Sequence, residues 1–312
     1  MHDIKMGLFG AGYFGNFHID NLLKTNFDLV GFYDTNIERA EFIQNKYKIP
    51  SFTDPDKLIS EVDAIDIATP TVHHFNLIKS AITAGKHVFV EKPITANSEQ
   101  ATEIIDILDN NLTKLQVGHI ERYNPAVRAL NIKNEKIINL ELNRYSQYNI
   151  RGTDVSVVFD LMIHDIDLLL HLKKEKIIDL QSTGFSKFGK NIEFARASFL
   201  YEDGTMATLN SSIIHPYNER KMKIWTKNDL FEIDLNNRIY DRYNYLNKID
   251  EKFRILNDKE SISFVTNNAI LEELNEFYDS IKFNRNPRVS ANDGFKSVKL
   301  AEEILHNINT RL

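Results

Sequence analysis

The sequence predicts two domains, an α/β domain with a parallel sheet over residues 1–118 and an α+β domain with a mostly antiparallel sheet over residues 119–312. In the first part, short apolar runs alternate with helical stretches, and the runs occupy residues 4–9, 29–33, 64–68, 87–90 and 115–117. Runs this apolar are typical of parallel strands that helices cover on both faces. A chain of 312 residues with 42% hydrophobic content can give each domain a packed core.

After Gly118 the repeated strand-helix alternation stops. We expect a short helix at residues 124–130, a strand near residues 137–147 and a second helix at residues 159–172. Later segments alternate polar and apolar residues with a period of two, which predicts strands at residues 194–201, 206–214, 221–226 and 230–235. Two helices are expected to close the chain, at residues 269–283 and 294–309.

The composition argues against several classes of function. The net charge of -6 disfavours a nucleic acid as the main partner, because binding its backbone needs a concentrated positive field. No stretch approaches the roughly 18 uninterrupted apolar residues of a membrane span, and residues 1–10 lack the features of a secretion signal. Cysteine is absent, which rules out disulfides and cysteine-ligated metals. We therefore expect a cytoplasmic protein without a membrane segment.

A glycine motif follows the first predicted strand directly. Gly10, Gly12 and Gly15 have the G-x-G-x-x-G spacing, and a helix is expected to begin after them. In a Rossmann domain the first glycine permits the tight turn, the second lets a pyrophosphate approach the backbone, and the third lets helix and strand pack closely. The motif predicts a dinucleotide site, to which the intervening Tyr13 and Phe14 also belong. The alternative is a glycine turn without a ligand.

Asp34 ends the second predicted strand, 19 residues after Gly15. An acid at this position accepts hydrogen bonds from the adenine ribose and repels a 2'-phosphate, so NAD is expected rather than NADP. Asp34 could also cap the helix expected at residues 37–47, and both roles are compatible.

Two further motifs lie at the ends of later strands. Thr69-Pro70 is followed by His74, four residues after the proline, and Ala84-Gly85-Lys86-His87-Val88 leads into Glu91-Lys92-Pro93. With the glycine turn, these motifs resemble those of the glucose-fructose oxidoreductase, inositol dehydrogenase and rhizopine-catabolism family, usually written Gfo/Idh/MocA. The resemblance implies an oxidoreductase that uses a nicotinamide cofactor.

The resemblance also assigns roles to individual residues. Lys92 would be catalytic, beside the nicotinamide and the substrate, and the residues near the cofactor would be Thr69, Pro70, His74 and Glu91. The position of Lys92 agrees with this role, because ligands bind open α/β sheets at the carboxyl ends of the strands. The alternative for Lys92 is a solvated surface lysine.

Asp160 and His164 lie four residues apart and would share one face of the predicted helix. The family resembled has an Asp and a His at this spacing, where the His exchanges a proton with the substrate hydroxyl, so both are candidate catalytic residues. Asp167 follows three residues later and is a candidate substrate contact. A metal site at these three residues is disfavoured, because no cysteine or further histidine motif completes it.

The chain departs from the commonest family pattern, since Val155-Ser156-Val157-Val158 and Met162 stand where glycines are frequent. With the segment 118–125, this departure resembles the branch that oxidises nucleotide-linked amino sugars, such as UDP-N-acetylglucosamine 3-dehydrogenases. Candidate substrate contacts in that segment are Arg122, Tyr123 and Asn124. Arg220-Lys221 could meet a diphosphate, or could be surface residues beside a strand.

The resulting hypothesis is hydride transfer between a secondary alcohol of a sugar or sugar nucleotide and NAD, with His164 or Lys92 taking the proton. One alternative is an NADPH-dependent reductase of a keto-sugar, imine or tetrapyrrole. Another is a non-catalytic protein that senses a dinucleotide, although it would not need Lys92 and His164 together. A homodimer or homotetramer is expected, because an exposed sheet face with apolar residues favours a partner.

Overall fold

The computed structural model describes residues 4–109, 111–132, 135–148, 155–249, 255–265 and 267–310. The chain forms two compact units, residues 1–120 with 268–299 and residues 121–267 with 300–312. The first break lies two residues from the predicted boundary at Gly118. Residues 268–299, however, pack with the first unit, whereas the predicted domain of residues 119–312 included them.

The first unit is built on six parallel strands in the order β3-β2-β1-β4-β5-β6. Their bounds are β1 (Lys5–Phe9), β2 (Asp28–Tyr33), β3 (Ser51–Phe52), β4 (Ala64–Ile67), β5 (His87–Glu91) and β6 (Leu115–Gly118). This order is that of the Rossmann fold, and the predicted α/β class with a parallel sheet is confirmed. All four residues of β4 are buried, as expected for a central strand covered on both faces.

Helices follow the strands of this unit in turn. They are α1 (Tyr13–Leu22), α2 (Ile37–Tyr47), α3 (Pro55–Glu61), the 3-10 turn η1 (Thr71–His73), α4 (His74–Thr83) and α5 (Ser98–Asp109). The side chain of Asn36 accepts a hydrogen bond from the Arg39 N–H and caps α2. The side chain of Asp54 caps α3, whose first residue is Pro55.

Helix α8 (Ala269–Lys282) explains why the chain returns to the first unit. Its buried residues Leu274, Phe277 and Tyr278 pack in one cluster with apolar residues of the first unit. Among these are Phe27, whose ring centroid lies 5.1 Å from that of Tyr278, and Phe89 of β5, 5.9 Å from Phe277. The apolar stripe of α8 is readable from its sequence, but the surface that it covers is not.

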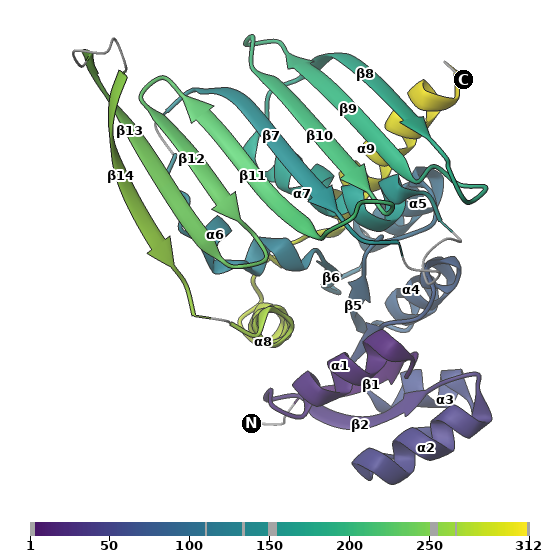
Figure 1. Cartoon of the computed structure of the whole chain (residues 1–312). Helices are drawn as coiled ribbons and strands as arrows, with labels where there is room; N and C mark the ends of the chain where they lie inside the picture. Colours follow the sequence, from purple (N-terminus) through teal and green to yellow (C-terminus); the bar gives the residue numbers. More distant parts are fainter. Residues whose placement is uncertain are drawn as a thin grey trace. The chain divides into compact units, whose positions relative to one another are not determined.

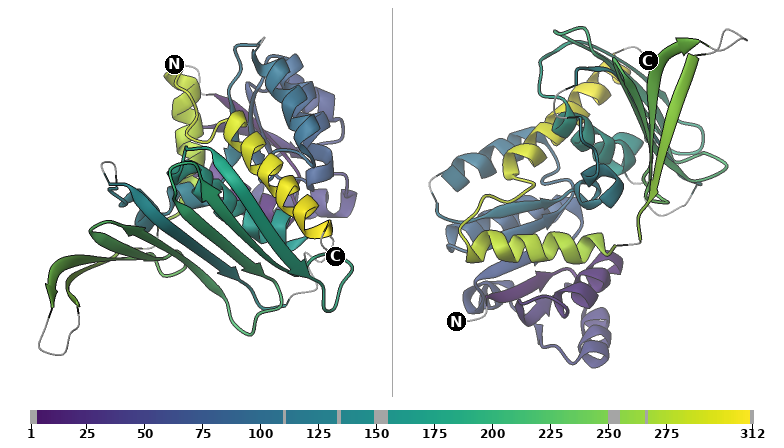
Figure 2. Two further views of the ribbon diagram at one scale, coloured as in Figure 1. Left: turned by 90° about the horizontal axis from the view of Figure 1, so that it is seen from above. Right: turned by 90° about the vertical axis from the view of Figure 1, so that its left-hand side faces the viewer.

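The second unit contains an eight-stranded sheet in the order β14-β13-β12-β11-β7-β10-β9-β8 (Figure 1). The strands are β7 (Ile137–Tyr145), β8 (Ile177–Phe185), β9 (Phe194–Tyr201), β10 (Met206–Ser212), β11 (Glu219–Thr226), β12 (Asp229–Asp234), β13 (Ile239–Ile249) and β14 (Ile255–Ser263). Only β7 and β10 pair in parallel among these named strands, so the predicted mostly antiparallel sheet is confirmed. Figure 2 shows the long β13–β14 hairpin at the edge of this sheet.

The helical elements of the second unit are η2 (Ile120–Tyr123), α6 (Pro125–Arg128), the π-helical turn η3 (Val158–Met162) and α7 (Ile163–Leu172). Helix α9 (Ala291–Asn309) ends in this unit. The predicted helix at residues 159–172 therefore starts as a π turn, in which hydrogen bonds close wider rings than in an α-helix. No glycine or proline marks this widening in the sequence, so the prediction missed it.

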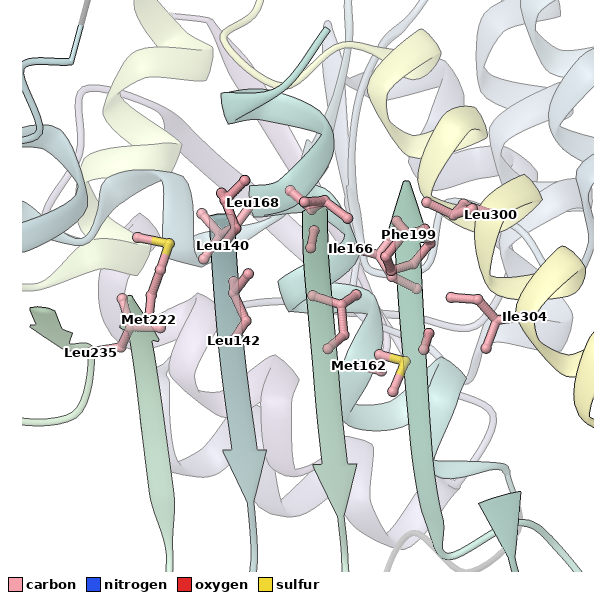
Figure 3. Close-up of a cluster of buried hydrophobic side chains, with 14 of the residues drawn as sticks. Leu140, Leu142, Met162, Ile166, Leu168, Phe199, Met222, Leu235, Leu300 and Ile304 are labelled. Carbon is pink, nitrogen blue, oxygen red and sulfur yellow. The ribbon is translucent and has the colours of Figure 1, made fainter. Parts of the chain in front are cut away.

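One face of the sheet packs on α7 and α9 through a large apolar cluster (Figure 3). Leu140 and Leu142 of β7 face Ile166 and Leu168 of α7, while Ile304 of α9 packs in the same cluster. The period-two pattern of the strands sends their alternate side chains into this layer. Among the described residues, no helix combines the length and apolarity needed to cross a bilayer.

Candidate functional site

Four strands of the first unit end at residues that the sequence singled out. Gly10 follows β1, Asp34 follows β2, Thr69 comes two residues after β4, and Lys92 follows β5. Because these strands are parallel neighbours, their carboxyl ends lie at one edge of the sheet. The strand order reverses between β1 and β4, which is where ligands bind in open α/β sheets.

Each glycine of the turn meets a different constraint. Gly10 has a φ of +90°, which side-chain-bearing residues rarely adopt. A Cβ atom on Gly15 would lie 1.9 Å from the carbonyl oxygen of Gly10, so only glycine lets α1 pack this closely. A Cβ atom on Gly12 would instead meet nothing closer than Arg39 Nη1 at 3.8 Å. Space is therefore kept open above Gly12, as expected for the approach of a pyrophosphate.

Asp34 braces the glycine turn. Its Oδ2 accepts the Ala11 N–H at 2.9 Å and its Oδ1 accepts the Asn36 N–H at 2.8 Å. The cap of α2 is Asn36, so the capping alternative for Asp34 is wrong. Arg39 Nη1 lies 3.5 Å from Asp34 Oδ2, and a cation beside this acid reduces its repulsion of a phosphate. A direct contact between Asp34 and the ribose remains a prediction.

The residues at this edge fit a bound dinucleotide. Gly12 is the N-cap of α1 and has no side chain that could cap the helix. The N–H groups of the first turn are therefore open to an anion. Thr69 Oγ1 is buried and has no hydrogen-bond partner among the described residues. Tyr13 and Phe14 are 67% and 60% exposed, so their rings can contact a ligand at the turn.

The segment Glu91-Lys92-Pro93, the corner at Lys92, is held in place from two sides. The backbone N–H of Lys92 donates to Glu91 Oε2 at 3.2 Å. His74 Nδ1 lies 2.9 Å from the Pro93 carbonyl oxygen, and its Nε2 lies 2.9 Å from that of Thr69. His74 is 1% exposed, so it ties two loops of the edge together rather than presenting its ring to a ligand. Lys92 itself is half-buried, and Pro70 is exposed.

A buried charged cluster adjoins this corner, and the sequence analysis missed it. His18 of α1 contacts Asp66 Oδ2 through Nδ1 at 2.7 Å and Glu91 Oε1 through Nε2 at 3.1 Å. Burial alone would lower the pKa of His18, but the two carboxylates raise it well above the ordinary value of 6.5. Burial raises the pKa of Asp66. Burial would also raise the pKa of Glu91, but the hydrogen bond and charge of His18, together with Lys92, bring it below its ordinary value. His18 and Glu91 therefore form an ion pair.

Helix α8 adds a further acid to the cluster. Glu273 is fully buried, and neither of its carboxylate oxygens has a hydrogen-bond partner among the described residues. Burial and the neighbouring Glu91 raise the pKa of Glu273 well above its ordinary value. The backbone carbonyl of Glu273 accepts the side-chain amide of Gln116 at 2.8 Å.

The second unit contains the other two predicted catalytic residues. Asp160 lies in the π turn η3 and His164 in the first turn of α7, and both side chains are half-buried. π turns occur often at functional sites, which agrees with a role for this segment. Their assignment as catalytic residues remains a prediction.

The predicted substrate contacts in the segment after Gly118 are largely occupied by the protein itself. Arg122 donates from Nε and Nη2 to the two carboxylate oxygens of Asp167, at 2.8 and 2.6 Å. Asn124 caps α6 and donates to the Leu235 carbonyl oxygen at 2.9 Å. All of these side chains and Tyr123 are buried. The contacts of Arg122, Asp167 and Asn124 hold neighbouring segments of the second unit together. A direct contact of these residues or of Tyr123 with a substrate remains a prediction.

A second buried arginine links β7 to α7. Arg144 donates to Asp165 Oδ1 from Nε and Nη2 at 2.9 and 2.8 Å, and to Glu121 Oε1 from Nη1 at 2.9 Å. Burial alone would raise the pKa of Glu121, but the charges of Arg144 and Arg220 bring it below its ordinary value. Arg220 of β11 lies opposite Arg144 of β7 in the strand register, so both side chains share one face of the sheet. Lys221 points to the opposite face. Of these two candidates for a diphosphate contact, only Arg220 shares the face that α7 covers.

Comparison with known proteins connects these features to a family. A family model described as an oxidoreductase family with an NAD-binding Rossmann fold matches residues 4–119. This range contains the glycine turn, the Thr69-Pro70 motif and the Glu91-Lys92-Pro93 corner.

Relatives extend the similarity beyond this range. UDP-N-acetylglucosamine 3-dehydrogenase of Acidithiobacillus ferrooxidans is 29% identical over 287 residues, which cover 91% of each chain. A solved structure of UDP-N-acetylglucosamine 3-dehydrogenase GnnA from the same organism matches this chain with a TM-score of 0.93. Its sequence is 27% identical, and the match covers 99% of each chain. scyllo-Inositol dehydrogenase from Lactobacillus casei, solved with bound NAD(H) and scyllo-inositol, shares the fold with a TM-score of 0.80 at 22% identity, over 99% of this chain and 98% of that one.

The glycine turn yields a matched pair of variants. Gly15→Ala should lower the free energy of unfolding by about 1 to 3 kcal/mol, because its Cβ clashes with the Gly10 carbonyl oxygen. Gly12→Ala should leave unfolding nearly unchanged and weaken NAD binding on the order of tenfold, because its Cβ enters the open space. Denaturant unfolding and NAD titration measure both effects. Equal loss of stability in the two variants would contradict this division of roles.

Arg144 offers a test of the buried charges. Arg144→Met should cost about 3 to 5 kcal/mol of unfolding free energy, because Glu121 and Asp165 would lose the buried cation that they share. Lys223→Met, which breaks a surface pair with Glu232 at 2.8 Å, should cost less than about 1 kcal/mol. Denaturant unfolding of both variants measures the difference, and similar costs would show that the buried network adds little.

Proposed function

Because the chain belongs to the Gfo/Idh/MocA family of NAD-dependent oxidoreductases, we propose that it oxidises the C3 hydroxyl of UDP-N-acetylglucosamine with NAD. The observation that carries this proposal is the similarity to a UDP-N-acetylglucosamine 3-dehydrogenase over nearly the whole chain, in sequence and in fold. The glycine turn, with open space above Gly12, supports the cofactor.

The proposed chemistry needs a hydride acceptor, a cation and a proton acceptor. Bound NAD supplies the acceptor for the hydride that leaves the alcohol carbon. In the proposal Lys92 holds the hydroxyl oxygen and stabilises the negative charge that develops on it, while His164 takes the hydroxyl proton and passes it to water. Asp160 would orient His164. Loss of one hydride and one proton converts the secondary alcohol to a ketone, so atoms and charge balance.

The substrate and cofactor can be tested in one assay. The purified protein should reduce NAD when UDP-N-acetylglucosamine is added, followed by the absorbance of reduced nicotinamide, and should reduce NADP more slowly. Lys92→Met should lower kcat by about 100-fold or more, because it removes the cation while keeping the side-chain length.

Lys24→Met, at an exposed lysine of the same unit, is the control and should keep the wild-type rate. Absence of NAD reduction by a protein that binds NAD would remove UDP-N-acetylglucosamine as the substrate. A panel of free sugars and polyols would then identify the substrate class. Full activity of Lys92→Met would remove Lys92 from the mechanism.

We also propose that the chain forms a homo-oligomer through the sheet face that points away from α7. Met206 of β10 and Leu200 of β9 lie opposite each other in the strand register. Their side chains point away from the core, because the next residue of β10, Ala207, belongs to it. They are 54% and 38% exposed, and Phe185 on the same face is 48% exposed. Met206→Glu should shift the sedimentation coefficient toward the monomer. A wild-type protein that sediments as a monomer at micromolar concentration would refute this proposal.

The absence of cysteine favours a reducing compartment, so we propose a cytoplasmic location. Cell fractionation tests this assignment, and recovery outside the cytoplasmic fraction would contradict it.

A further inference from the structure

His18 connects the interior of the first unit to the corner at Lys92. Its ring is fully buried in α1, and its two nitrogens contact acids on two neighbouring strands, Asp66 in β4 and Glu91 in β5. Asp66 lies inside its strand and is fully buried, whereas the side chain of Glu91 is 20% exposed. The ring therefore connects a fully buried acid, Asp66, with an acid at the edge of the sheet, Glu91.

Glu91 carries the connection onward. Its Oε1 contacts His18, and its Oε2 accepts the backbone N–H of Lys92 at 3.2 Å. A Cβ atom at Gly118 of the adjacent strand β6 would lie 3.1 Å from Glu91 Oε1, so the glycine leaves room for this carboxylate. Both oxygens of Glu91 are thus engaged, one on each side of the corner.

The surrounding charges explain why this position needs a cation. Two acids contact the His18 ring, Asp66 of β4 and Glu91 of β5, and Glu273 of α8 interacts with it electrostatically. Burial of Glu91 disfavours its charge, and of the groups that offset burial His18 contributes most, ahead of Lys92. The raised pKa of His18 and the lowered pKa of Glu91 agree with an imidazolium that keeps Glu91 ionised.

We propose that His18 is a positioning residue for the dehydrogenase reaction, which fixes the Glu91 carboxylate and, through it, the backbone and side chain of Lys92. His18 contacts neither substrate nor cofactor in this role, and acts only through Glu91. The inference rests on the proposed catalytic function of Lys92. A displacement of the reacting group by about 1 Å can cost on the order of 100-fold in rate, so a support of this kind affects kcat.

Two substitutions of His18 separate this role from a purely structural one. His18→Gln puts an amide N–H near the position of Nε2 and keeps the contact to Glu91. His18→Asn puts one near Nδ1 and keeps the contact to Asp66. If positioning of Glu91 matters, kcat should fall on the order of tenfold or more in His18→Asn and by less than about threefold in His18→Gln. The NAD dissociation constant should stay within about twofold in both variants.

A second measurement does not depend on turnover. Hydrogen exchange of the Lys92 backbone amide, measured without ligands, should be faster in His18→Asn than in His18→Gln, because its acceptor Glu91 loses its support. Glu273→Gln is the matched control, since it is buried beside the same cluster and keeps the size of the side chain. It should change neither kcat nor the exchange of Lys92.

The possible results have distinct meanings. The positioning role is refuted if His18→Asn keeps the wild-type kcat and the wild-type exchange rate of the Lys92 amide. It is also refuted if kcat falls and exchange speeds up equally in His18→Asn and His18→Gln. If His18→Asn does not fold, Glu91→Ala removes the same link at a partly exposed position and should reproduce the loss of kcat and the faster exchange. A wild-type enzyme that does not oxidise UDP-N-acetylglucosamine would refute the proposed substrate, while the exchange of Lys92 would still decide the role of His18.

Discussion

The parallel alignment of strands in the six-stranded sheet is the constraint on which the candidate site depends. Neighbouring strands lie about 4.8 Å apart, so residues that follow their carboxyl ends come together although they are far apart in sequence. Gly10, Asp34, Thr69 and Lys92 all occupy such positions. The middle residues of β1, β4 and β5 are buried, so the residues that can reach a ligand are those that follow the strand ends. The sheet thus separates a core that stabilises the unit from an edge that can bind a ligand.

Buried charge is the second common feature, and it occurs in both units. A buried ion is costly unless a partner compensates it with good hydrogen-bond geometry. In the second unit Arg122 and Arg144 each bond a carboxylate of α7, Asp167 and Asp165 respectively. These pairs hold α7, which carries His164, to the neighbouring segments β7 and η2. Each arginine makes two hydrogen bonds to its carboxylate, so the two ion pairs together fix the orientation of α7.

The limits of prediction follow from the distance over which each signal acts. The glycine turn and the strand-end motifs are local patterns with a known geometry, so their positions could be predicted from neighbouring residues. His18 could not, because its partners lie 48 and 73 residues away and a histidine in an amphipathic helix carries no local signal. The bond of Arg122 to Asp167 could not be predicted for the same reason, since the two residues are 45 positions apart. The return of α8 to the first unit likewise depends on a surface that the helix sequence does not describe.

The two buried histidines of the first unit show how partners decide what the same side chain does. His18 faces carboxylates, which stabilise an imidazolium enough to overcome burial. His74 faces two carbonyl oxygens, whose partial charges do not overcome burial, so the pKa of His74 falls below its ordinary value. A neutral ring can donate to only one of those carbonyls, so His74 forms one hydrogen bond and packs its other nitrogen against the second loop. The corner at Lys92 is thus supported by a charged contact on one side, from His18 through Glu91, and by a neutral contact of His74 on the other.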